Sequence, residues 1–376
     1  MSNIQTILAQ MAEAVSNPAS TVSNYRERTG KGAVGCIAPY TPEELVHAAG
    51  MLPVGLWGGQ VELNKVRATL PPFACSIMQS VKELELNGAY DGLTAVLCPS
   101  ACDTLKAIGQ KWTRKDVPMI PFVHPHNRQL PAARVFLAKE YLSVKKRLEQ
   151  AAGTAISDEA IQASIAVYNE HRAAMRAFAE AAGAHPGQIS PKARHLVFKS
   201  AFFMRKEEHT ALVRELNSLL NALPEESWKG PRVILSGILA EPDCVLDTFA
   251  DLGIAIAADD LAQESRQSRV DVPDGGDPLE RLAAQWQAMY GCSLAYEHQK
   301  SRVPMLAEMC QRYHADGVVV AMMKFCDPEE FDYPMIKQAM EAAGIPLLQI
   351  EIDQQAQSVE QLRTRLQSFA EILQAR

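Results

Sequence analysis

Apolar runs alternate with amphipathic stretches through the first third of the chain. Each run is bounded by glycine, proline or other turn residues, which predicts short buried strands. The predicted strands cover residues 33–38, 51–57, 93–97 and 119–122. Apolar positions at helical spacing predict helices over 4–16, 21–29 and 76–86. Strands that alternate with helices in this way are typical of a parallel sheet.

The start of one further helix is predicted in more detail, near Thr41. Thr41 is a residue type that caps helix starts, Pro42 suits a first helical turn, and Glu44 stands at capping-box spacing. We therefore expect the side chain of Thr41 to be the N-cap of a helix that ends near Gly50.

The pattern changes after residue 130. Residues 131–222 are rich in Ala, Arg, Lys and Glu, with apolar positions at helical spacing up to Pro224. Apolar runs then return at 232–237, 254–257, 317–322 and 346–352, followed by a helix over 360–373. We predict an α/β fold of two Rossmann-like or flavodoxin-like parallel-sheet domains, 1–130 and 226–376, with residues 131–225 as a helical layer between them.

The composition excludes several classes of protein. The 376 residues carry a net charge of -7, which argues against a general nucleic-acid or membrane-surface partner. The amino end lacks a signal-peptide pattern, and no run of about 18 apolar residues predicts a membrane span. We expect a cytoplasmic protein, whose eight cysteines are reduced, buried or metal-bound rather than paired in disulfides.

Three cysteines stand at positions suited to a shared site. Cys102 and Cys326 each follow a predicted strand, and Cys75 begins a predicted helix. The carboxyl ends of parallel strands border the reactive crevice, so these thiols can converge there. Thiolates suit iron–sulfur clusters, and three ligands would leave one iron of a four-iron cluster open. The chain has no CxxC pair, so spacing alone also permits each cysteine to be a small buried hydrophobe.

Three other polar segments are candidates of lower specificity. Residues 122–128, with His124 and His126, could face the same crevice or form an exposed loop. Arg266 and Arg269 could bind an anion or serve a structural role. Lys111, Arg114 and Lys115 could bind coenzyme A phosphates or lie on a solvated surface. The glycines of residues 55–59 lack the spacing of a nucleotide-binding loop, and no acid–base pair stands out as catalytic.

An ordered set of segments resembles a known family. The set comprises residues 35–45, 48–54, Pro72-Phe73-Ala74-Cys75, Cys102-Asp103-Thr104-Leu105-Lys106, Lys324-Phe325-Cys326-Asp327-Pro328-Glu329 and residues 361–365. Together they resemble the 2-hydroxyacyl-CoA dehydratase / benzoyl-CoA reductase family, from about residue 33 to the end. Residues 259–266 resemble the β subunits of (R)-2-hydroxyglutaryl-CoA dehydratases.

The resemblance implies a [4Fe-4S] cluster with Cys75, Cys102 and Cys326 as its protein ligands. It leaves Cys98 as a core thiol beside the site, while Cys36, Cys244, Cys292 and Cys310 are expected to be structural. A bound flavin, FMN or riboflavin, is also compatible with the family.

The implied activity is that of a hydro-lyase. Such an enzyme removes water from an (R)-2-hydroxyacyl-CoA, here expected to be 2-hydroxyglutaryl-CoA, by syn or anti elimination through a ketyl radical. This chain would be the β subunit of a heterodimer with an α subunit, and its cluster would relay or hold an electron supplied by an ATP-dependent iron–sulfur activator. The alternatives are a subunit of an acyl-CoA reductase, a non-catalytic electron-transfer scaffold, and a small-molecule binding protein with incidental cysteines.

Overall fold

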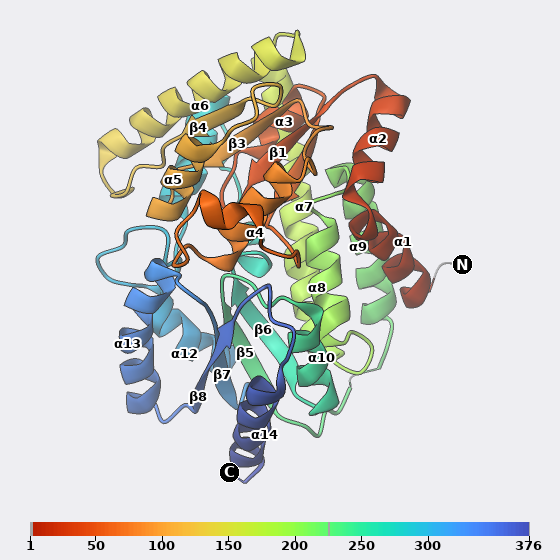
Figure 1. The fold of residues 1–376 in the computed structure, drawn as a ribbon. Helices are drawn as coiled ribbons and strands as arrows, with labels where there is room; N and C mark the ends of the chain where they lie inside the picture. The colour runs from red at the N-terminus through yellow and green to blue at the C-terminus, as the bar shows by residue number, and fades with distance from the viewer. Residues whose placement is uncertain (1–2, 225, 376) are drawn as a thin grey trace.

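Two parallel four-stranded sheets lie one above the other, the N-terminal sheet uppermost in Figure 1. The computed structural model describes residues 3–224 and 226–375. The strands are β1 Ala33–Ile37, β2 Leu52–Leu56, β3 Ala95–Pro99, β4 Met119–Phe122, β5 Arg232–Gly237, β6 Ala255–Leu261, β7 Gly317–Met323 and β8 Leu347–Ile352. The predicted α/β class with two parallel sheets is confirmed.

The two sheets share one strand order. The first runs β2-β1-β3-β4 and the second β6-β5-β7-β8. In each, the first strand pairs in parallel with the second on one side and with the third on the other, as in Ala33↔Leu52 and Val34↔Ala95. The order therefore reverses between β1 and β3 and between β5 and β7. Parallel sheets bind ligands beyond the carboxyl ends of the strands at such a reversal.

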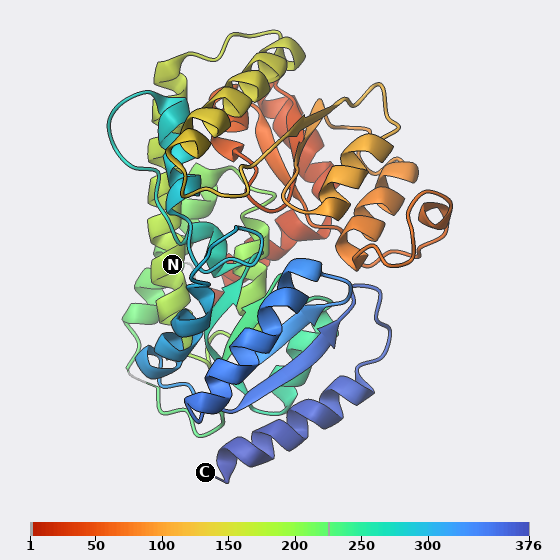
Figure 2. The same cartoon turned by 90° about the vertical axis from the view of Figure 1, so that its left-hand side faces the viewer.

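Helices surround both sheets. They are α1 Ile4–Ser16, α2 Pro18–Thr29, α3 Glu43–Ala48, α4 Ser76–Leu86, α5 Asp103–Lys111, α6 Pro131–Ala152, α7 Asp158–Ala184, α8 Pro191–Ser200, α9 Lys206–Asn221, α10 Asp243–Asp251, α11 Pro278–Ala288, α12 Arg302–Arg312, α13 Asp327–Ala342 and α14 Glu360–Gln374. The long α7 packs against α3 of the first half and β6 of the second, and Figure 2 shows it running alongside both. None of the described helices has the length and apolar character needed to cross a bilayer.

Two local predictions were wrong. The helix near Thr41 begins at Glu43 without a side-chain cap, because the Thr41 hydroxyl donates to the Ile37 carbonyl at 2.6 Å instead. Strand β6 continues to Leu261, beyond the predicted end at residue 257, and includes Asp259 and Asp260. Carboxylates are depleted from strands, but both of these are buried against arginines, so tertiary pairing outweighs the local preference.

A segment from the second half packs against the first sheet. Residues of 272–295, including Leu282 and Trp286 of α11, share one buried apolar cluster with Val34 of β1 and Leu97 of β3. Helix α11 also packs against α6. The segment that follows β6 of the second sheet therefore packs on the first sheet and helps to form its apolar core. The domain boundaries at residues 130 and 225 stay a prediction.

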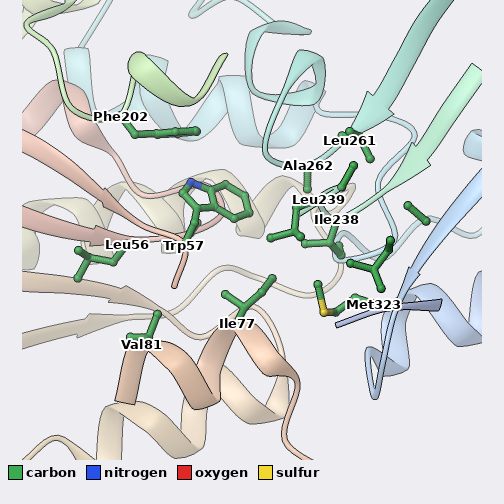
Figure 3. Packing of buried hydrophobic residues seen from close by; sticks show 14 of the residues in the cluster. Leu56, Trp57, Ile77, Val81, Phe202, Ile238, Leu239, Leu261, Ala262 and Met323 are labelled. Carbon is green, nitrogen blue, oxygen red and sulfur yellow. The ribbon is translucent and has the colours of Figure 1, made fainter. Parts of the chain in front are cut away.

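A continuous apolar cluster joins the two sheets (Figure 3). Trp57 and Ile77 from the first half face Leu239 and Met323 from the second, and Phe202 packs beside Trp57 with ring centroids 5.5 Å apart. Polar contacts cross the same boundary. The Gln354 side-chain amide donates to the Trp57 carbonyl at 3.0 Å, and the Val61 N–H donates to Gln355 Oε1 at 2.9 Å. These contacts fix the two carboxyl edges relative to each other.

Candidate functional site

Each of the three predicted ligands is the N-cap of a helix. Cys75 precedes α4, Cys102 precedes α5 and Cys326 precedes α13. All three are free and partly exposed. None of the three sulfurs accepts a cap hydrogen bond, but backbone N–H groups of the first turn act to lower the pKa of each thiol. A helix N-terminus stabilises negative charge, so each sulfur stands where a metal-bound thiolate is favoured.

The structure brings the three thiols into one neighbourhood. Cys75, Cys102 and Cys326 all pack against the apolar cluster that joins the two sheets. The Ser76 hydroxyl, next to Cys75, donates to the sulfur of Met323 at 3.1 Å, and Met323 ends β7 just before Cys326. Cys102 and Cys326 follow β3 and β7, which hold the same place in their respective sheets. Both halves of the chain therefore contribute sulfur to one place.

Burial governs the protonation of these thiols. It raises the pKa of Cys75 to about 11, raises that of Cys102, and raises that of Cys326 further. Negative charge on the neighbouring cysteines adds to the rise for Cys75 and Cys326. Without a metal the three thiols are protonated at neutral pH. Metal binding would release their protons, because thiolate is the ligating form.

The chemistry of the three donors suits an iron–sulfur cluster, because thiolates are soft ligands. Within residues 3–224 and 226–375, no group of three or more His, Cys, Asp or Glu side chains is arranged to hold one metal ion. A four-iron cluster binds each thiolate to a different iron, so its ligands surround a larger volume. Half-buried sulfurs at three helix starts, beside an apolar wall, are a donor set of that kind.

The turn that carries Cys326 has an unusual backbone. Phe325 has φ of 62°, in the left-handed region that non-glycine residues rarely adopt. The Cys326 N–H donates to the Met323 carbonyl at 3.0 Å, which closes the turn between β7 and α13. The Lys324 N–H donates to the Ile352 carbonyl at 3.0 Å and ties the turn to β8. Cys326 is therefore presented by a short turn whose geometry is fixed by its neighbours.

The other cysteines differ in position. Cys36, Cys98, Cys292 and Cys310 are buried, and Cys244 is partly exposed in the first turn of α10. Cys98 lies in β3 with its sulfur 3.6 Å from the Leu105 carbonyl, on the α5 side of the strand. Cys292 accepts a bond from the Tyr40 hydroxyl at 2.8 Å. These surroundings suit the structural role expected for Cys36, Cys292 and Cys310. They also suit the core position expected for Cys98, while the structural role expected for Cys244 stays a prediction.

The histidine segment is not simply an exposed loop. His124 is buried in an aromatic box, with its ring centroid 4.3 Å from that of Trp286 and 5.2 Å from that of Phe122. This burial lowers the pKa of His124 to about 3, so the imidazole is neutral. Arg128 is also buried and donates to the Gln287 carbonyl at 2.9 Å. His126 is exposed. The segment anchors the end of β4 to the α11 region.

The basic candidates are largely paired. Arg266 is fully buried and bonds Asp260, which Arg269 also bonds at 2.6 Å. Arg114 bonds Asp91 and Asp116. These contacts favour the structural interpretation for all three arginines. Sequence reasoning missed Arg302, a further member of the Asp260 network, because its partners are scattered from residue 236 to residue 332.

A family model described as 2-hydroxyglutaryl-CoA dehydratase, D-component, matches residues 39–373. The chain belongs to this family. It is 52% identical over 375 residues to the lactoyl-CoA dehydratase subunit beta of Anaerotignum propionicum. It is 42% identical over 375 residues to the (R)-phenyllactyl-CoA dehydratase beta subunit of Clostridium sporogenes. Each alignment covers 99% of this chain and 100% of the relative.

A third relative shares less sequence over the same span. The (R)-2-hydroxyglutaryl-CoA dehydratase subunit beta of Acidaminococcus fermentans is 38% identical over 379 residues, 98% of this chain and 100% of the relative. The predicted family is thus confirmed, as is the prediction of a dehydratase component that acts in coenzyme A thioester chemistry.

Proposed function

We propose that this chain is the β subunit of a 2-hydroxyacyl-CoA dehydratase and that Cys75, Cys102 and Cys326 hold its [4Fe-4S] cluster. One observation carries the proposal. Three partly exposed thiols, each at a helix N-terminus, pack against the apolar cluster that joins the two sheets, and two of them follow the carboxyl ends of β3 and β7. The family match to residues 39–373 supplies the reaction class.

The chemistry explains why such a site is needed. The β-hydrogen of a 2-hydroxyacyl thioester is barely acidic, so no ordinary side-chain base is matched to it. Adding one electron gives a ketyl radical anion, which expels hydroxide from C2 and makes the β-proton acidic. After that proton leaves, returning the electron gives the enoyl thioester. A bound cluster would supply this one-electron chemistry, since cluster potentials reach low values. The chain's own part is to hold the thiolates.

The proposed partner is an α subunit that binds the acyl-CoA, with an ATP-dependent iron–sulfur activator as electron donor. The relatives are named beta subunits, which supports a heterodimer. Large apolar side chains are exposed close to the cysteines in sequence, Phe73 at 67% and Phe331 at 80%. Exposed apolar side chains of this kind are usual where a protein partner binds. A flavin and a cytoplasmic location stay predictions.

For the acyl group, we propose to test lactoyl-CoA before 2-hydroxyglutaryl-CoA. The relative named for lactoyl-CoA is 52% identical to this chain, whereas the relative named for 2-hydroxyglutaryl-CoA is 38% identical. Turnover of each thioester by the complex with an α subunit and activator would decide between them.

Metal analysis of anaerobically purified chain tests the cluster. We expect about four irons and four sulfides per chain, as in a [4Fe-4S] protein. Cys75→Ser, Cys102→Ser and Cys326→Ser should each lose most of the iron. Cys244→Ser is the matched control, since Cys244 is also partly exposed in a first helical turn. Equal iron loss in all four variants, or none in the first three, would overturn the proposal.

A further inference from the structure

Arg302, the first residue of α12, is a buried cation with an unusually complete set of partners. It is 1% exposed. Its Nε donates to Asp260 Oδ2 at 2.8 Å and its Nη2 to the Ser236 hydroxyl at 2.8 Å. Nη1 and Nη2 also donate to the two carboxylate oxygens of Glu329, at 2.9 and 2.7 Å. The guanidinium thus forms a bidentate hydrogen bond with Glu329. Asp260 of β6 and Ser236 of β5 fix its position.

Glu329 connects this grip to the predicted cluster ligand. It lies in the first turn of α13, is 1% exposed, and donates its N–H to the Cys326 carbonyl at 3.0 Å. The Ser293 hydroxyl completes its surroundings at 2.6 Å. The helix start that carries Cys326 is therefore tied to the second sheet mainly through Glu329, whose two-pronged partner is Arg302 and whose second cation, Arg266, lies 3.8 Å away. Arg302 also lies 3.6 Å from Asp332 of the same helix.

We propose that Arg302 is a positioning residue for the cluster. Through Glu329 it fixes the turn that presents Cys326, and it masks the charge of Glu329 from the metal site. The inference rests on the proposed function, because it takes Cys326 to be a ligand.

The backbone shows why Cys326 needs such support. Phe325 holds a left-handed conformation immediately before it. Backbone strain of this type persists only where the surroundings impose it. With Glu329 released, the first turn of α13 has lost its buried anchor and the turn can relax. Cys75 and Cys102 follow residues without a positive φ.

The charge arrangement gives a second consequence. Glu329 is a buried carboxylate close enough to Cys326 to act on the charge of its sulfur. An unmasked negative charge disfavours adding an electron to a nearby site, whereas Arg302 compensates that charge. Removing Arg302 and removing the charge of Glu329 should therefore move the reduction potential in opposite directions.

Four variants separate the effect of the bidentate Arg302–Glu329 bond from the effect of the two charges. Arg302→Lys keeps the positive charge but cannot form the two-pronged bond. Arg302→Met removes charge and bond. Glu329→Gln removes the negative charge and leaves one oxygen to accept a hydrogen bond from Arg302. Arg194→Met is the matched control. Arg194 is equally buried at 2% exposure and bonds Asp259 and Glu264, neither of which lies on α13.

The rate of iron loss to a chelator measures how well Cys326 is positioned as a ligand. Outer partners of metal ligands typically contribute about 10–100-fold in affinity, so Arg302→Lys should lose iron at least ~10-fold faster than the wild-type chain. Arg194→Met should be destabilised but should keep the wild-type rate. In chain stripped of iron, alkylation by iodoacetamide should speed up at Cys326 in Arg302→Lys and stay unchanged at Cys75.

Redox titration of the iron-loaded chain measures the effect of the Arg302 and Glu329 charges on the reduction potential. The potential should fall in Arg302→Met and rise in Glu329→Gln, with Arg194→Met unchanged. If Arg302→Met does not fold, the Glu329→Gln shift decides. Equal iron release from Arg302→Lys and Arg194→Met, or potential shifts of the same sign, would overturn the inference. A folded wild-type chain that binds no iron would instead overturn the proposed function, and the alkylation rates would still test the positioning of Cys326.

Discussion

The two carboxyl edges that meet at the candidate site are built from the same strand order but held together differently. Beyond the first sheet lie aromatic rings, with Tyr40 and the neutral His124 packed against Trp286. Beyond the second lies a buried ion network centred on Asp260, which bonds Arg266, Arg269 and Arg302. One edge relies on packing and the other on compensated charge.

The difference shows how one topology can present equivalent ligands through different supports. Cys102 follows β3 and Cys326 follows β7, the third strand in each half. Cys102 stands on a helix whose buried residues, Leu105 and Ile108, are apolar. Cys326 stands on a helix whose buried residues include the carboxylates Glu329 and Asp332. Cysteines at equivalent positions in the two sheets are therefore carried by helices whose buried residues differ in polarity.

The largest expected effect comes from removing one ligand from either edge. Cys102→Ser and Cys326→Ser should each lower turnover by the complex by roughly 100-fold or more, beyond the range typical of outer-shell partners. Coenzyme A thioester binding to the complex should persist, because an electron site is lost rather than a binding site. Turnover and equilibrium binding of the thioester check this. If Cys102→Ser abolishes thioester binding with the fold intact, this chain itself holds the substrate.

The second prediction compares the two supports directly. Asp260→Ala leaves the buried Arg266 and Arg302 and the half-buried Arg269 short of a partner, so the free energy of unfolding should fall by about 3–5 kcal/mol. Tyr40→Phe removes only the bond to Cys292 and should cost about 1 kcal/mol. Denaturant unfolding of both variants measures the contrast. Similar losses in the two would show that the edges are supported alike.

The third prediction uses two histidines with opposite pKa shifts. Burial acts to lower the pKa of His195, but its bonds to Glu241 and Glu264 raise it to about 9, above 6.5 in the unfolded chain. The folded state then holds a proton that the unfolded state has released between pH 6.5 and 9. His195 therefore contributes stability that is fully present below pH 6.5 and lost as the pH rises through 9.

His124 has the reverse dependence. Its pKa is lowered to about 3, so below pH 6.5 the unfolded chain binds a proton that the folded chain does not. Its contribution is lost as the pH falls from 6.5 towards 3. Melting temperature against pH should lose part of its alkaline slope in His195→Gln and part of its acid slope in His124→Phe. Unchanged slopes in both variants would contradict these assignments.

The smallest effect on stability is expected at the exposed aromatic beside the site. Phe331→Ser should change the free energy of unfolding by less than about 0.5 kcal/mol, since Phe331 is 80% exposed. It should nevertheless weaken the complex with the α subunit, as judged by native mass spectrometry across a dilution series. Full retention of the complex would show that the partner binds elsewhere.

Sequence reasoning succeeded where local pattern and structure agree. The predicted bounds of 76–86, 119–122 and 232–237 are those of α4, β4 and β5. It was wrong where tertiary contacts outweigh local preference, at the Thr41 cap and at the carboxylates that extend β6. The three cysteines could be named from strand ends and family resemblance, but no spacing along the chain predicts that Arg302 joins residues of β5, β6 and α13.

The central claim is that thiols from both halves of the chain bind one cluster. Crystals grown without oxygen and measured at the iron absorption edge would test it through the anomalous difference map. The account predicts one compact iron peak bounded by the sulfurs of Cys75, Cys102 and Cys326. The account would be contradicted if the iron lay at Cys98 or Cys244. It would also be contradicted if the anaerobic crystals contained no iron and the thiols of Cys75, Cys102 and Cys326 were free.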